Sequence, residues 1–188
     1  TQEVFKVIRK ILCPTDLSAN SKAGVAYALS LARENRAELV VFHATSFPVY
    51  ELAYPGEPNP FLGGNSVPRF TVDQLLRDAT SKVRHFIHAN FGDEITQVQW
   101  KPKAGLGKVA REIVAAARQE EADLIVMAKK KKRPLSCILS RSVSEAVSRQ
   151  APCPVVSVSP PQIQRTWRGR RVPWTGGVLQ DSEAYHNP

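Results

Sequence analysis

The stretch ILCPTDLSANSKAGVAYALSLARENRAELVVFHA, residues 11–44, decides the fold because it carries a strand, a helix and a second strand in succession. An apolar run over residues 7–13 predicts the first strand, and the sequence PTDLS follows it as a loop. Helical periodicity then covers residues 20–35, and the continuously apolar residues 39–44 predict a fully buried strand. This order is typical of a βαβ unit with parallel strands.

The same alternation continues to about residue 160. Further helices are predicted over residues 71–90, 108–119 and 142–149, and further strands over residues 95–101, 123–128 and 155–159. Ser142 and Glu145 have the spacing of a helix capping box. The pattern predicts an α/β fold in which a doubly wound, five-stranded parallel sheet carries helices on both faces, as in Rossmann-like proteins.

Composition indicates one domain and a disordered end. The 188 residues are 43% apolar, and no run reaches the ~18 to 20 apolar residues that span a bilayer. We expect a single domain over residues 1–160, a long Pro- and Gly-rich loop at 47–70, and a disordered basic tail at 161–188. The start shows no signal-peptide pattern, and the three cysteines are sparse, so we expect a cytoplasmic protein without a membrane partner.

The net charge of +9 is concentrated in two segments. Residues 129–141 hold six basic residues and residues 165–171 hold four, with no acidic residue in either. Removing these ten from the 26 basic residues leaves 16 against 17 acidic ones, so the rest of the chain is nearly neutral. Either the segments are simply solvated, or they contact RNA or another polyanion. The candidate polyanion contacts are Lys129, Lys130, Lys131, Lys132, Arg133, Arg141, Arg165, Trp167, Arg168, Arg170 and Arg171.

A ligand crevice is predicted where the winding of the sheet reverses, outside the carboxyl ends of the strands. Asp16 follows the first strand and the lysine run follows the fourth, so both face this crevice if the two strands are neighbours. The helix that begins after Ser142 would point its free amides to the same place. Asp16 has a plainer interpretation too, as a cap of the following helix.

The opening stretch and the closing stretch EEADLIVMAKKKKRPLSCILSRSVSEAVSRQAPCPVVSVSP, residues 120–160, resemble the two ends of universal stress proteins. The resemblance covers about residues 5–160 and implies the adenine nucleotide alpha hydrolase-like fold. It also implies that Asp16 reaches a ribose and that backbone groups of Val41 meet adenine. The candidate nucleotide pocket is Pro14, Thr15, Asp16, Val41, Ala128, Lys131, Arg141, Ser142 and Val143.

The phosphate loop of the family departs from its pattern in this chain. Nucleotide-binding members carry G-x-x-G, nine residues, then G-S or G-T, whereas the three glycine positions here are Ala128, Lys131 and Arg141. Lysines supply charge but not the close approach of backbone amides to phosphates. ATP is the one candidate cofactor that the resemblance implies. The lost glycines argue against its binding in the usual manner.

Three functions remain open at this point. We expect no catalytic set and no metal site, because the sequence lacks the motifs of nucleophilic, zinc and P-loop chemistry. The first expectation is a non-enzymatic stress-response adaptor. The resemblance implies that it is a homodimer, paired through the last predicted strand, from Val155 to Ser159. The alternatives are an adenine-nucleotide sensor with a modified pocket, and a nucleic-acid- or ribosome-associated stress factor.

Overall fold

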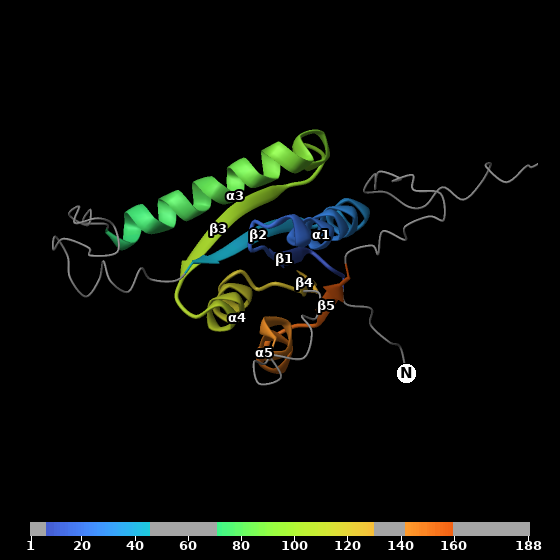
Figure 1. Ribbon diagram of the computed structural model, residues 1–188. Coiled ribbons are helices and arrows are strands. Elements are labelled where there is room, and N and C mark those ends of the chain that lie inside the picture. The colour runs from blue at the N-terminus through green and yellow to red at the C-terminus, as the bar shows by residue number, and fades with distance from the viewer. Residues whose placement is uncertain (1–6, 46–70, 130–141, 160–188) are drawn as a thin grey trace, which may run out of the picture.

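The computed structural model describes residues 7–45, 71–129 and 142–159 (Figure 1). The predicted loop at 47–70, the lysines after Lys129, Arg133, Arg141 and the predicted tail at 161–188 lie outside the described residues. The described part contains five strands, four α-helices and one 3-10 turn. In chain order these are β1 (Lys10–Pro14), η1 (Ala19–Ser21), α1 (Lys22–Asn35), β2 (Glu38–Thr45), α3 (Val72–Ile95), β3 (Trp100–Leu106), α4 (Val109–Gln119), β4 (Leu124–Ala128), α5 (Val143–Gln150) and β5 (Val155–Val158).

The sheet has the predicted architecture. Its strand order is β3-β2-β1-β4-β5, and every neighbouring pair is parallel. The winding direction reverses between β1 and β4, which pair through Ile11 with Leu124 and Leu12 with Ile125. The doubly wound parallel sheet is therefore confirmed.

Side chains alternate between two cores because successive residues of a strand face opposite sides of the sheet. Ile11 and Val41 join the core under α1 and α3, where Val83 and Ile87 of α3 are fully buried. Leu12 and Phe42 join the core under α4 and α5, with Ile113 and Val147 as helix partners. Figure 1 shows α1 and α3 on one face of the sheet and α4 and α5 on the other.

The third strand lies later in the chain than predicted. Residues 95–101 alternate in the sequence, but Ile95 is the buried last residue of α3, one helical turn after the buried Phe91. The strand begins at Trp100 and ends at Leu106, five residues beyond the predicted end at residue 101. The alternation was misread because a helix end and a strand start share this short segment.

Two helices, α3 and α5, begin at a residue whose side chain caps them. At α3 the Thr71 side chain accepts a hydrogen bond from the Gln74 amide, and the Gln74 side-chain oxygen accepts one from the Thr71 amide, which completes a capping box. At α5 the Ser142 Oγ accepts from the Glu145 amide at 3.2 Å. The predicted return contact of Glu145 is not formed, because its carboxylate pairs with Arg149 at 2.9 Å, one turn along the exposed helix face.

Candidate functional site

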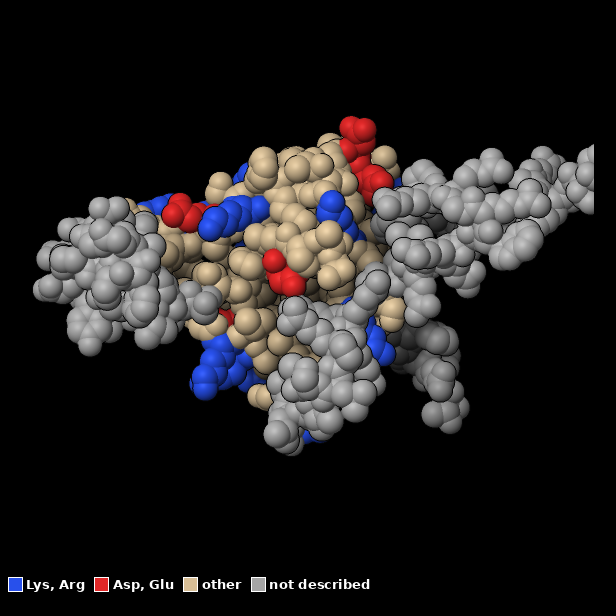
Figure 2. All heavy atoms as spheres, in the orientation of Figure 1, with Lys and Arg blue, Asp and Glu red and all other residues tan. Residues whose placement is uncertain are grey.

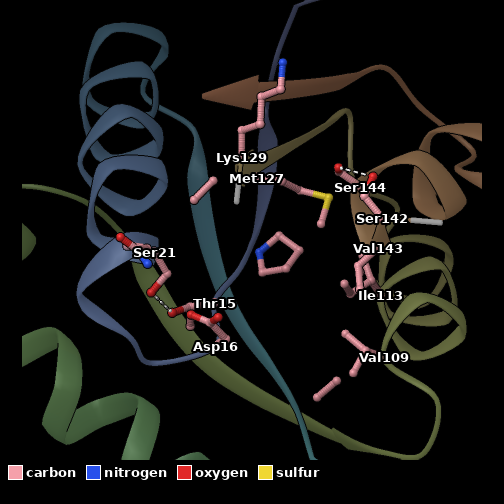
Figure 3. Close-up of a pocket in the computed structure, with 14 residues that line it drawn as sticks. Thr15, Asp16, Ser21, Val109, Ile113, Met127, Lys129, Ser142, Val143 and Ser144 are labelled. Carbon is pink, nitrogen blue, oxygen red and sulfur yellow. Dashed lines mark hydrogen bonds between the residues drawn. The ribbon is translucent and has the colours of Figure 1, made fainter. Parts of the chain in front are cut away.

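A cavity of about 310 Å³ opens at the reversal of the winding (Figure 3). It is formed at the carboxyl ends of β1, β2 and β4 and at the amino ends of α4 and α5, which is where doubly wound sheets bind ligands. Its volume lies at the lower end of the range of about 300 to 1,000 Å³ for small-molecule sites. The lining residues are Pro14, Thr15, Asp16, Asn20, Ser21, Ala44, Val109, Ile113, Met127, Ala128, Lys129, Ser142, Val143 and Ser144.

The two sides of the cavity differ in chemistry. Figure 3 shows Thr15, Asp16 and Ser21 on one side, and Val109, Ile113 and Val143 on the opposite side. A hydroxyl- and carboxylate-bearing wall therefore faces an apolar one. Such a pair of walls suits a ligand with a flat apolar part and a polyhydroxylated part.

The polar wall is a braced loop. Thr15 and Ser21 are buried, and their hydroxyl oxygens lie 2.8 Å apart. The Leu17 amide donates to Thr15 Oγ1 at 3.0 Å, and Ser21 Oγ donates to the Ser18 carbonyl at 2.8 Å. Asp16 is exposed, and its Oδ1 accepts hydrogen bonds from the amide and the hydroxyl of Ser18. Asp16 thus braces the turn before η1 while it lines the cavity.

The amino end of α5 forms part of the rim. Ser142, Val143 and Ser144 all line the cavity, and Ser142 Oγ lies 3.1 Å from Ser144 Oγ. The amides of the first helical turn have no acceptor within their own helix, and the helix dipole adds partial positive charge there. This rim therefore favours a negatively charged group, as the sequence predicts.

Comparison with known proteins decides the family. A profile of the Universal stress protein family matches residues 8–159. Universal stress protein MJ0531 of Methanocaldococcus jannaschii is 32% identical over 159 residues, which cover 82% of this chain and 84% of that protein. The chain belongs to the universal stress protein family. A universal stress protein of Methanothermobacter thermautotrophicus is 28% identical over 152 residues, covering 81% of this chain and 96% of its own length.

Solved universal stress proteins share the fold of this one. UspA from Lactobacillus plantarum aligns with a TM-score of 0.57 at 20% identity, over 80% of this chain and 97% of that structure. A universal stress protein in complex with cAMP aligns with a TM-score of 0.51 at 20% identity, over 81% and 98% of the two chains. The α/β class predicted from the sequence is thus the class of the family's solved structures.

The structure brings together six of the nine candidate pocket residues of this universal stress protein. Pro14, Thr15, Asp16, Ala128, Ser142 and Val143 all line the cavity, whereas Lys131 and Arg141 lie outside the described residues.

Val41, the remaining candidate, does not line the cavity. Its side chain is fully buried in the core under α1 and α3, because Val41 sits in the middle of β2. Ala44, three residues on at the carboxyl end of β2, lines the cavity instead. The rule that ligands bind at strand ends would have selected Ala44 from the sequence.

Lys129 is the one member of the predicted polyanion segments that the structure describes. Its backbone amide donates to the Val158 carbonyl at 2.7 Å, and its side chain is exposed. Figure 3 shows its ammonium group pointing away from Thr15 and Asp16. Elsewhere, the face in Figure 2 carries both acidic and basic described side chains among mostly uncharged atoms. Whether the basic segments bind a polyanion stays a prediction.

An ion-pair cluster, which sequence reasoning missed, lies at the opposite end of the strands. Glu120 at the end of α4 contacts Lys103 at 2.6 Å and Lys101 at 2.7 Å, and Glu38 contacts Lys101 at 3.1 Å and Lys10 at 3.4 Å. Burial by itself would raise the pKa of Glu120, but hydrogen bonds from Lys101 and Lys103 outweigh it and lower that pKa to about 2. In the sequence, the sign of this ion-pair cluster is that Lys101 and Lys103 alternate along β3.

Other reactive groups give no second site within the described ranges. Burial raises the pKa of the Cys13 thiol to about 12, so this cysteine is an inert core residue. Residues 7–45, 71–129 and 142–159 contain no group of three or more His, Cys, Asp and Glu side chains placed to hold a metal. No helix in these ranges is long and apolar enough to cross a membrane.

Proposed function

We propose that this universal stress protein is a non-enzymatic stress-response adaptor whose cavity senses an adenine nucleotide. The observation that carries the proposal is the cavity itself, which lies at the winding reversal with a polar wall at Asp16 and an apolar wall at Val109 and Ile113. This combines the adaptor expected from the sequence with its nucleotide-sensing alternative.

The two walls suit the two parts of a nucleoside. A purine ring is flat and largely apolar, so Val109, Ile113 and Val143 offer it a fitting surface. The Asp16 carboxylate accepts hydrogen bonds and can receive those of sugar hydroxyls. One universal stress protein of the same fold is described as a complex with cAMP, which supports an adenine ligand for this cavity.

The phosphate end of the ligand is the part on which this chain departs from its family. The α5 rim at Ser142, Val143 and Ser144 supports an anion, but the family's first glycine position is Ala128. We therefore expect the nucleoside part to supply most of the binding energy. The affinity should depend little on the number of phosphates.

A tryptophan at the cavity mouth tests the proposal. Val109 is the first residue of α4, is 41% exposed and lines the cavity, so Val109→Trp fills ligand space without disturbing the core. We expect it to weaken ATP and adenosine binding about tenfold or more in calorimetric titrations. Val72→Trp is a matched control, because Val72 is the first residue of α3, is 49% exposed and lies away from the cavity. Equal binding by both variants would contradict the proposal.

Two predictions about partners accompany this proposal. β5 lies at one edge of the sheet, and an exposed edge can pair with a second copy, which supports the homodimer through residues 155–159. The nucleic-acid alternative rests on the basic segments, of which the structure describes Lys129 alone. Binding to RNA that weakens steeply with salt would favour it.

A further inference from the structure

We propose that His43 is a positioning residue that holds the Thr15–Asp16 peptide in the orientation the cavity needs. This inference rests on the proposed function, because it assigns a role in ligand binding to a residue that does not line the cavity. His43 Nδ1 lies 2.9 Å from the Thr15 carbonyl oxygen, at the start of the polar wall.

The chemistry of the two atoms fixes the direction of this hydrogen bond. A carbonyl oxygen only accepts, so His43 Nδ1 must carry the hydrogen and donate it. The adjacent amide of Thr15 donates to the Phe42 carbonyl at 2.8 Å. Two consecutive residues of β2 therefore anchor Thr15 from both sides: Phe42 holds its amide and His43 holds its carbonyl.

The anchored peptide unit leads directly into Asp16. The Thr15 carbonyl and the Asp16 amide belong to one planar group, so the bond to His43 fixes the plane from which the Asp16 side chain starts. Beyond it, Ser21 Oγ donates to the Ser18 carbonyl, which leaves Thr15 Oγ1 as the donor to Ser21. Thr15 Oγ1 in turn accepts from the Leu17 amide, so one continuous chain of hydrogen bonds runs through the polar wall.

The loop needs such bracing because part of it is strained. Leu17 has a φ of 59°, in the left-handed region that residues with a Cβ avoid. A conformation of this kind persists only when surrounding bonds determine it. The bond from His43 to Thr15 lies two residues before the strained position and outside the loop's own network, so it ties that network to the sheet.

Three histidine variants test the role. His43→Leu removes the donor, and His43→Asn returns an N–H close to the position of Nδ1. His85→Leu is the control, because His85 is exposed on α3. We expect His43→Leu to weaken adenosine and ATP binding by about tenfold, His43→Asn to recover most of it, and His85→Leu to bind as the unchanged chain does.

Two measurements without ligand keep the inference separate from the proposed function. Nitrogen-15 NMR of the unchanged protein should show His43 with a hydrogen on Nδ1 when the ring is neutral. Hydrogen exchange of the Leu17 amide should be about tenfold faster in His43→Leu than in His43→Asn. A neutral ring protonated at Nε2, or equal exchange in the two variants, would overturn the inference.

The binding results distinguish the two claims. If the unchanged protein binds adenosine and His43→Leu binds it equally well while staying folded, the positioning role is wrong and the proposed function stands. If the unchanged protein binds neither adenosine nor ATP, the proposed function is wrong and the role of His43 in ligand binding fails with it.

Discussion

A single glycine sets how closely α1 approaches the site. A Cβ built on Gly24 would lie 2.8 Å from the backbone nitrogen of Ala128, at the end of β4 where the cavity begins. Backbone atoms cannot move aside as a flexible side chain can. The packing of α1 against β4 therefore depends on the missing side chain, although a helix interior ordinarily favours alanine over glycine.

We predict that Gly24→Ala destabilises the protein by about 1 to 3 kcal/mol, because the clash with Ala128 exceeds the gain in helix propensity. Chemical denaturation measures the change. Gly92→Ala is the control, because a Cβ on Gly92 in α3 would meet nothing within 4 Å. The control should be neutral or stabilised by up to about 1 kcal/mol. Gly24→Ala with unchanged stability would show that α1 does not pack this closely.

At this scale the sequence predicts residue types better than contacts. Asp16, Ser142 and Val143 were found because a loop carboxylate and a helix start are local signals. Val41 was taken from the resemblance alone, whereas the rule that ligands bind at strand ends selects Ala44, three residues on, which lines the cavity. His43 has no motif around it that predicts a role, and only the fold brings its ring to Thr15, 28 residues earlier.

Two ion pairs of Glu120 attach the end of α4 to the sheet. At the end of α4, the Glu120 carboxylate is 12% exposed and bridges to Lys101 and Lys103 of β3. These bonds also raise the pKa of Lys101, through its hydrogen bond to Glu120 first of all. Because α4 supplies Val109 and Ile113 to the apolar wall, the ion pairs help to fix that wall from the far end.

This cluster predicts a specific loss of stability in acid. The pKa of Glu120 is about 2 in the folded protein and 4.5 as the reference value, so the unfolded chain binds its proton first as pH falls. The stabilisation is complete above about pH 4.5 and is lost progressively toward pH 2. We expect Glu120→Gln to cost about 2 kcal/mol at pH 7, and the gap to the unchanged protein to shrink across that window.

Unfolding followed at a series of pH values measures the effect. Glu145→Gln is the control, because Glu145 pairs with Arg149 on an exposed face of α5 and contributes little. A gap between Glu120→Gln and the unchanged protein that stays constant from pH 5 to pH 2 would refute the role of Glu120.

The start of α5 should depend on its cap. Ser142→Ala removes the acceptor of the Glu145 amide and should destabilise the protein by about 1 kcal/mol. Ser148→Ala, inside the same helix, should be neutral or slightly stabilising, since Ser148 only bonds back to the Ser144 carbonyl. Thermal unfolding compares the two. Equal melting temperatures would mean that the cap contributes nothing.

For the whole molecule, the order of elements was the strongest signal in the sequence. Alternating strands and helices predict a parallel doubly wound sheet, and the strand order observed in the structure places β1 beside β4 and the cavity between their ends. What the sequence could not give was the shape of the cavity, since the facing of Asp16 toward Val109 and Ile113 depends on elements far apart in the chain. The ion pairs of Glu120 depend on the same long-range packing.

A calorimetric titration of the full chain with ATP and with adenosine, at low and at high salt, tests the proposed nucleotide site most directly. We expect saturable binding of both ligands that survives high salt and is weakened by Val109→Trp, because the nucleoside part occupies the cavity. Absence of binding, or ATP binding that high salt abolishes while adenosine does not bind, would contradict it. The cavity would then not be the ligand site, and ATP would be held by charge alone.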